Sequence, residues 1–181
     1  MFPHERSLVK KMQGKPFALL GVNTDGNLNQ VKSDLKKENI TWRSWYDGQG
    51  GPICSKFAVR SFPTIFVLDE KGVIRYKNVR NEQMDQAVET LVKDLEKRSP
   101  KESASADEKS SEDKPTASDD KPAASGDKPA ASGEENKSAA AIGFNVGNRA
   151  PEISGKDADG KTFKLSEYRG KVVVLDFWGF W

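Results

Sequence analysis

The chain has 181 residues, and its 29 lysines and arginines against 27 aspartates and glutamates give a formal net charge of only +2. This balance favours no particular partner, and the length suits one ordinary domain or two very small ones. The longest apolar runs are far shorter than the roughly 20 residues of a membrane span, and no charged-then-apolar leader opens the chain. A single cysteine, Cys54, excludes an internal disulfide and a multi-cysteine metal site.

The first part of the chain alternates between helical and strand-like segments. Residues 4–12 and 28–39 carry apolar side chains at helical spacing, whereas residues 17–22 form a short apolar run that is typical of a buried strand. Residues 40–47 alternate as a strand does, and Pro52 marks the start of a short helix.

A hairpin and a longer helix are predicted next. Residues 64–79 favour two strands that turn at residues 70–72, and Asn81 is expected to cap the helix that follows. This helix should turn five apolar residues inward: Met84, Val88, Leu91, Val92 and Leu95. The predicted order of these elements is therefore α-β-α-β-α-β-β-α.

The composition changes abruptly at residue 99. From there to about residue 141 the chain is rich in Lys, Asp, Glu, Ser, Ala and Pro, and no aromatic residue occurs between Tyr76 and Phe144. Such a segment buries too little apolar surface to offset the entropy of ordering, so we expect a disordered linker that proteases cut first. Its seven-residue repeats, which begin at Lys114, have no apolar a and d positions and predict no coiled coil.

The last part of the chain predicts further strands. Residues 157–160 have turn chemistry between two short strands, and residues 171–177 favour a final buried strand. Together with the earlier elements, they predict an α/β fold in which a central mixed sheet has helices on both faces.

Several of these segments resemble one family of proteins. Residues 59–72, VRSFPTIFVLDEKG, resemble the part of thioredoxin-fold proteins in which a cis-proline, here Pro63, begins a central strand. Residues 172–181, VVVLDFWGFW, resemble the strand in which a final tryptophan is followed directly by Cys-x-x-Cys, and residues 1–12 resemble the helix just beyond that motif. With the lead-in at residues 150–171, the chain resembles the redoxin group, which comprises TlpA-like thiol-disulfide oxidoreductases and alkyl hydroperoxide reductase/thiol-specific antioxidant proteins.

The resemblance implies a thioredoxin-like fold in permuted order. Residues 1–98 would be the C-terminal part of such a domain, residues 99–142 the linker and residues 143–181 the N-terminal part. The chain would then be cut at the active-site Cys-x-x-Cys, either as a circular permutant or as a piece of a tandem protein. We expect residues 171–177 to insert as a central parallel strand beside residues 17–22.

The resemblance also implies site residues. Asp176 lies in an apolar strand, where desolvation raises the pKa of a carboxyl group, and the family uses an acid here as proton acceptor for its buried second cysteine. The alternative is a sheet-edge aspartate paired with a lysine. The expected substrate-binding residues are Pro63, Phe62, Trp178 and Trp181, although the two tryptophans suit core packing equally well. No metal ion or cofactor is expected.

The other chemically notable residues are interpreted as structural. Cys54 lies on the far side of Pro63 and has no partner cysteine, which favours a structural thiol over a nucleophile. His4 is expected on the surface of the first helix. Trp42 and Trp45 could imitate a stacking platform for single-stranded nucleic acid, but packing beside a core is the commoner explanation.

Two classes of function remain open. The first is a thiol-disulfide oxidoreductase or peroxidase in the intact gene product, acting on disulfides or peroxides in cell redox homeostasis, with this chain alone inactive because it has no Cys-x-x-Cys. The second is a non-catalytic module that holds an extended peptide beside Pro63. Neither a nucleic-acid partner nor a membrane span is expected.

Two further points follow from the resemblance. It suggests the bacterial cell envelope or periplasm, although the residues themselves assign no compartment. Many TlpA-like relatives carry a glutamate two residues before the kink proline, here Pro3, and Met1 stands at that place. The chain therefore offers no such glutamate to tune the cysteines.

Overall fold

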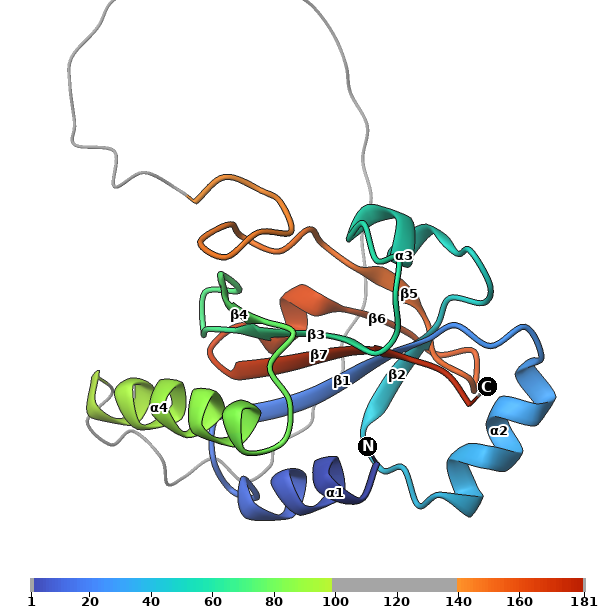
Figure 1. Ribbon diagram of the computed structural model, residues 1–181, viewed down its shortest axis with the longest axis horizontal. Helices are drawn as coiled ribbons and strands as arrows, with labels where there is room; N and C mark the ends of the chain where they lie inside the picture. Colours follow the sequence, from blue (N-terminus) through green and yellow to red (C-terminus); the bar gives the residue numbers. More distant parts are fainter. Residues whose placement is uncertain (1, 99–139, 181) are drawn as a thin grey trace, which may run out of the picture. The chain divides into compact units, whose positions relative to one another are not determined.

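A computed structural model describes residues 2–98 and 140–180 (Figure 1). The elements up to residue 98 follow the predicted order. In the chain the helices and strands are α1 (Phe2–Lys11), β1 (Phe17–Asn23), α2 (Leu28–Lys37), β2 (Arg43–Tyr46), α3 (Pro52–Lys56), β3 (Thr64–Leu68), β4 (Ile74–Lys77), α4 (Glu82–Arg98), β5 (Ser154–Lys156), β6 (Thr162–Lys164), the 3-10 helix η1 (Leu165–Tyr168) and β7 (Val172–Trp178). The predicted linker lies almost wholly outside the described residues and stays a prediction.

The described residues form a five-stranded sheet with the order β2-β1-β7-β3-β4 (Figure 1). The central strand is β7, which runs parallel to β1 and antiparallel to β3. Its register with β1 runs from Phe17 opposite Val172 to Asn23 opposite Trp178. The expected insertion of the C-terminal strand beside β1 is therefore confirmed.

Strand β7 is central because its residues suit burial on both faces. All seven of its residues are buried. Side chains alternate between the faces of a strand, so Val173, Leu175 and Phe177 join one core cluster, whereas Val172 and Val174 join the other. A continuous apolar run of this kind is typical of a strand that is covered on both sides.

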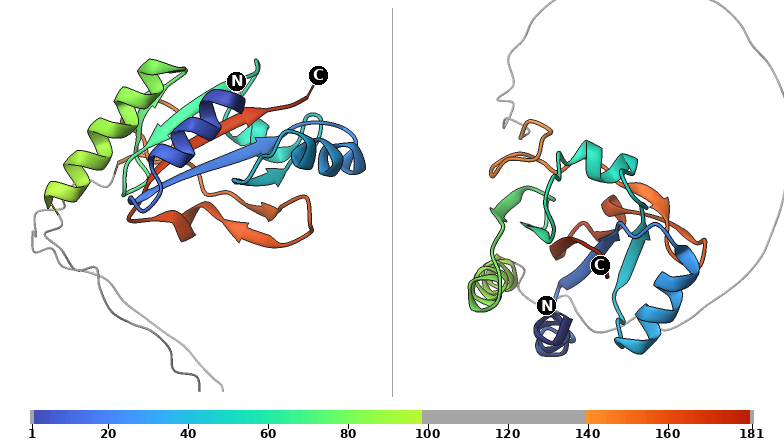
Figure 2. Two further views of the ribbon diagram at one scale, coloured as in Figure 1. Left: turned by 90° about the horizontal axis from the view of Figure 1, so that it is seen from below. Right: turned by 45° about the vertical axis from the view of Figure 1, so that its right-hand side comes forward.

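Different elements cover the two faces of the sheet. Helices α1 and α4 lie over one face, and the β5–β6 hairpin lies over the other (Figure 2). Helices thus lie on both faces as predicted, although the helix on the second face, α3, is a single short one beside the hairpin. The hairpin replaces a helix there by stacking Phe163 on Trp45, with ring centroids 4.0 Å apart.

The tryptophans of the β2 region are part of this packing. Trp45 is fully buried and donates a hydrogen bond from Nε1 to the carbonyl oxygen of Phe163 at 3.2 Å. Trp42 is also buried, on the other face of the sheet, where its ring centroid lies 6.5 Å from that of Phe2 in α1. Neither ring is available as a stacking platform for nucleic-acid bases.

Local turn chemistry forms both predicted hairpins. In the β3–β4 turn, the Asp69 carboxylate accepts hydrogen bonds from the backbone nitrogens of Lys71 and Val73. In the β5–β6 turn, the Asp157 carboxylate accepts from the backbone nitrogens of Asp159 and Lys161. An aspartate that binds the backbone two residues on is a common turn former, so these features were readable from the sequence.

The five predicted inward residues of helix α4 do face the core, but they are buried to different degrees. Met84, Val88 and Val92 are buried, whereas Leu91 and Leu95 are half-buried beside them. Asn81 precedes the helix as expected and contributes its main chain, because its carbonyl oxygen accepts from the backbone nitrogens of Met84 and Asp85.

Position 21 of β1 requires a glycine, because two side chains approach its backbone closely. A Cβ atom at this position would lie less than 3.0 Å from Ser44 Oγ and from Trp178 Nε1, both of which are buried. We expect Gly21→Ala to lower the free energy of unfolding by about 2 kcal/mol, as overpacking of a tight core does. Urea denaturation followed by circular dichroism measures this change.

Gly26→Ala is the matched control for this prediction. Its added Cβ atom would meet only the Gln49 side chain, at an ordinary contact distance of 3.5 Å. The effect of this substitution should therefore stay within about 1 kcal/mol. Equal stability of the two variants would contradict the prediction, because it would show that the side chains around Gly21 can move to make room for a methyl group.

Candidate functional site

Asp176 lies at the centre of the sheet. On β7 it is opposite Gly21 of β1 and Ile65 of β3. Its side chain faces α1 and α4, because it lies an even number of residues from Val172 and Val174. The residue is 0% exposed. The alternative interpretation, a sheet-edge aspartate paired with a lysine, is therefore wrong.

Helix α1 adds a second buried acid, Glu5. This residue lies on the same helical face as Leu8 and Met12, three and seven residues further on, and both of these belong to the core. Glu5 is 1% exposed, although it carries an ionisable group. Glutamate is almost never fully buried unless it is paired, so this position calls for a partner.

The partner of Glu5 is Asp176. The two carboxyl groups lie within hydrogen-bonding reach of each other. None of their four oxygens accepts a hydrogen bond from a donor group within residues 2–98 and 140–180. Two ionised carboxylates can only accept, so a hydrogen bond between them requires a proton on one of them. The pair therefore holds a proton when that bond forms.

Burial is the main reason why the pKa values of both acids are raised. It raises the pKa of Asp176 well above its usual value, and the neighbouring Glu5 carboxylate raises it further. Burial also raises the pKa of Glu5, against the smaller opposing effect of its hydrogen bond with Asp176. Since each group changes the ionisation of the other, the two acids titrate as a pair.

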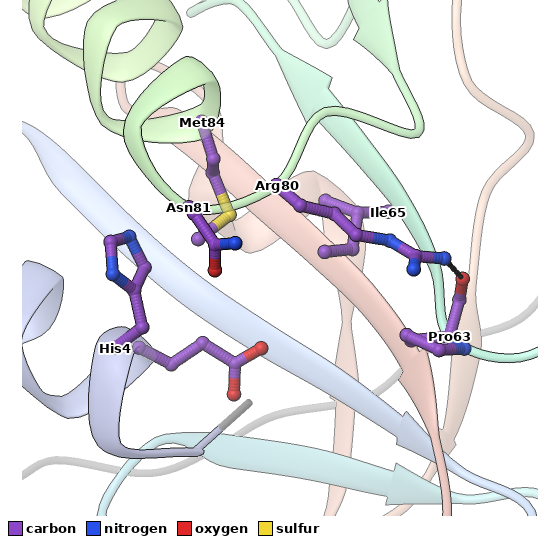
Figure 3. Close-up of a pocket in the computed structure, with 7 residues that line it drawn as sticks. His4, Pro63, Ile65, Arg80, Asn81 and Met84 are labelled. Carbon is purple, nitrogen blue, oxygen red and sulfur yellow. Dashed lines mark hydrogen bonds between the residues drawn. The ribbon is translucent and has the colours of Figure 1, made fainter.

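A cavity of about 300 Å³ lies beside Glu5 (Figure 3). It is lined by His4, Glu5, Pro63, Ile65, Arg80, Asn81 and Met84. The Arg80 guanidinium reaches across its edge and donates a hydrogen bond to the carbonyl oxygen of Pro63 at 2.8 Å (Figure 3). The cavity therefore connects the Pro63 segment with the buried carboxyl pair.

His4 has a more definite place than the sequence indicated. We expected it on the surface, but its side chain is 29% exposed and its Nε2 lies 3.0 Å from Asp85 Oδ1. This contact joins the start of α1 to the first turn of α4, at the edge of the cavity.

The segment at Pro63 has the geometry that the resemblance implied. The peptide bond between Phe62 and Pro63 is cis. Pro63 lines the cavity, and Phe62 is 38% exposed. Of the predicted site residues, Pro63 thus shares the cavity lining with Glu5, and Asp176 contacts Glu5 from the sheet.

The tryptophan predictions have different outcomes. Trp178 is only 1% exposed, and its ring packs edge-on against Phe2 at 5.2 Å and against Phe180 at 4.9 Å between centroids. Phe2 and Phe180 also contact each other, at 5.5 Å. The beginning of α1 and the end of the β7 segment therefore lie side by side. Trp181 lies outside the described residues.

Cys54 has the environment of a structural thiol. It is buried in α3, and burial together with the Asp47 carboxylate raises its pKa to about 12. Asp47 also accepts hydrogen bonds from the backbone nitrogens of Ile53 and Cys54. Only the thiolate is a nucleophile, so a thiol that stays protonated at neutral pH is a poor one.

Glu5 is the site residue that sequence reasoning missed. The available signal was its spacing from Leu8 and Met12, which places an acidic side chain on the apolar face of an amphipathic helix. A buried acid of this kind, beside a cavity and a second titratable group, marks a candidate functional site.

The described part of the chain shows neither a membrane-spanning helix nor a metal-binding cluster. No helix there is long and apolar enough to cross a membrane. No cluster of three or more His, Cys, Asp and Glu residues within residues 2–98 and 140–180 could hold a metal ion.

The fold and the site agree with one class of protein. A mixed sheet whose central strand carries a buried acid, next to a strand that begins after a cis-proline, is consistent with a thioredoxin-like fold. Comparison with known proteins points the same way. The AhpC/TSA family matches residues 146–181, a segment that contains β5 to β7 and Asp176.

One curated relative adds detail to this match. The thiol-disulfide oxidoreductase ResA of Geobacillus thermodenitrificans (strain NG80-2) is 47% identical over 36 residues, which cover 20% of this chain and 21% of the relative. The chain thus matches about a fifth of the length of that relative. No solved structure matches the chain significantly. The two sequence matches support a thioredoxin-fold redoxin.

Proposed function

We propose that this domain is the scaffold of a redoxin-type thiol-disulfide oxidoreductase, in which Asp176 accepts the proton of a buried cysteine thiol. The observation that carries the proposal is the Asp176 carboxyl group itself, fully buried on the strand that pairs with β3, which begins directly after the cis peptide bond at Pro63. A carboxyl group whose pKa is raised by burial is suited to exchange protons near neutral pH. Its substrates would be protein or small-molecule disulfides, or peroxides in the antioxidant branch of the family.

The attacking cysteines belong to a Cys-x-x-Cys motif that we place directly after Trp181 in the intact gene product. The contact between the Phe2 and Phe180 rings supports this position, because such a motif would lie near the first turn of α1. The N-terminal end of a helix stabilises a thiolate through the helix dipole. Residues 143–181 and 1–98 would then be the first and second parts of a redoxin domain, joined here in permuted order.

The reaction needs both cysteines of that motif. The first thiolate would attack the substrate disulfide and form a mixed disulfide, and the second would release it and become part of an intramolecular disulfide. Asp176 would take the proton of the second, buried thiol and so make it a nucleophile. Cys54 cannot replace either, since its thiol stays protonated and lies in the other core cluster.

The test is to add Cys-Gly-Pro-Cys and two further residues after Trp181 and to measure insulin reduction by dithiothreitol. The parent chain should show no turnover, and the extended chain should be active. Asp176→Ala should lower the rate of the extended chain by about 10²-fold, which is typical for loss of a general acid–base group. Pro63→Thr should also lower it.

Cys54→Ser is the matched control and should leave the rate of the extended chain unchanged. Turnover by the parent chain that disappears with Cys54→Ser would overturn the assignment of that thiol. A folded extended chain without turnover would favour a non-catalytic module that binds an extended peptide beside Pro63.

A further inference from the structure

Asp176 needs an intermediary to exchange protons with solvent. Its side chain is 0% exposed, and it does not contribute to the lining of the cavity beside Pro63. Glu5 contacts Asp176 and also lines that cavity. We propose that Glu5 is the proton relay of Asp176, passing one shared proton between Asp176 and water in the cavity.

The cavity has the size and the polar groups that water requires. Its volume of about 300 Å³ is several times the roughly 30 Å³ that one molecule occupies in liquid water. Pro63, Ile65 and Met84 form apolar walls, while Asn81 and the Glu5 carboxyl group offer hydrogen-bonding atoms. A chain of water molecules can therefore reach Glu5 and stop there.

No other charged group of the described residues takes over this role. Within residues 2–98 and 140–180, the cations that act on the pair come from α1 and from the segment before α4, and each has a partner elsewhere: His4 binds Asp85, Arg6 binds Glu38, and Arg80 binds the carbonyl oxygen of Pro63. These groups lower the pKa values of the pair from a distance, but none donates a hydrogen bond to it. Glu5 is thus the titratable neighbour that Asp176 contacts.

The relay has a defined sequence of proton transfers, and its catalytic use rests on the proposed function. At the start Glu5 carries the shared proton, so that Asp176 faces the thiol as a carboxylate. The thiol gives its proton to Asp176 and becomes a thiolate, while Glu5 releases its own proton to cavity water. The proton on Asp176 then moves to Glu5, which restores the starting state with one proton transferred from sulfur to solvent. No electron is gained or lost in these steps.

The relay can be tested on the full chain without added cysteines. After a pH jump, infrared absorption of the carboxyl groups, with ¹³C-labelled aspartate for assignment, measures the rate at which Asp176 gains or loses its proton. Glu5→Gln should slow that rate by about tenfold or more, a part of what general acid–base groups contribute. Glu5→Ala should slow the rate as well, and formate should restore some of the rate of this variant, because the shorter side chain leaves space beside Asp176 for a small carboxyl group.

Two further variants make the result specific. Glu5→Asp keeps the carboxyl group on a shorter side chain and should give an intermediate rate. Asp159→Asn removes an exposed acid that is neither part of the pair nor part of the cavity lining, and should leave the rate unchanged. Near-ultraviolet circular dichroism of the tryptophans checks that each variant is folded.

Equal proton-exchange rates in the parent chain and in Glu5→Gln would overturn the proposal. A slow rate of Glu5→Ala that formate does not restore would also overturn it, because a merely structural effect of Glu5 predicts that result. Since no cysteine takes part in this measurement, its outcome is independent of whether the extended chain shows turnover. Failure of the relay and failure of the proposed function are therefore distinguishable.

Discussion

Phe177→Ala should lower the free energy of unfolding by about 3–5 kcal/mol, the typical loss when a large buried ring is removed. Phe177 is fully buried on β7. Its ring centroid lies 5.3 Å from that of Phe57 and 5.8 Å from that of Phe66, two residues that come much earlier in the sequence. Small domains are stable by about 5–15 kcal/mol, so the variant would keep little stability.

Urea denaturation measures this loss, and Phe144→Ala is its matched control. Phe144 belongs to the same C-terminal segment but is 38% exposed. Its replacement should change the stability by less than about 1 kcal/mol. A similarly small effect of Phe177→Ala would show that β7 is not the strand that completes the core.

The local elements of this fold were predictable because their signals are local. The turns at Asp69 and Asp157 depend on side chains that bind the backbone within a few residues. The register of β7 could not be predicted from its apolar run alone. That run indicates burial on both faces of the sheet but does not indicate which strands lie beside β7. Its place beside β1 was expected from the resemblance to redoxins rather than from any pattern within the strand.

The element that covers the sheet face opposite α1 and α4 could not be predicted in the same way. The β5–β6 hairpin takes that place through the stacking of Phe163 on Trp45 and through the Arg43 guanidinium, which lies 4.0 Å above the Phe163 ring. An ion pair between Arg43 and Asp157 at 3.0 Å holds the hairpin turn to β2. These contacts join segments that are far apart in sequence. Because each of these residues could pair equally well with others, the sequence alone does not predict the contacts.

The two acids of the site differ in how visible they are in the sequence. Asp176 interrupts an apolar run, so its desolvation could be foreseen. Glu5 lies in a helix with many charged residues, where a glutamate is usually exposed, and its burial follows only from the way α1 packs on the sheet. The function of the pair depends on this contact, which no local pattern indicates.

Asp176→Asn should raise the free energy of unfolding near neutral pH by about 3 kcal/mol, since on folding the carboxylate must either take up a proton or be buried without a counter-charge, and both carry a penalty of several kcal/mol. Burial first, and then the Glu5 carboxylate, raise the pKa of Asp176 in the folded state above its usual value of 3.8. The folded protein therefore binds more protons than the unfolded chain from about pH 4 upward. The stability that protonated Asp176 contributes is complete below the unfolded pKa and is lost as the pH rises through the folded pKa.

The gain from Asp176→Asn should accordingly be small at about pH 4 and grow as the pH rises, because asparagine does not ionise. Urea denaturation at about pH 4, 6 and 8 measures the difference from the parent chain. Asp159→Asn changes an exposed aspartate of the β5–β6 turn and should show no such gain. An equal gain in stability for Asp176→Asn at all three pH values would mean that the pKa of Asp176 is the same in the folded and the unfolded chain. This result would contradict the role of Asp176 as a proton acceptor whose pKa is raised by burial.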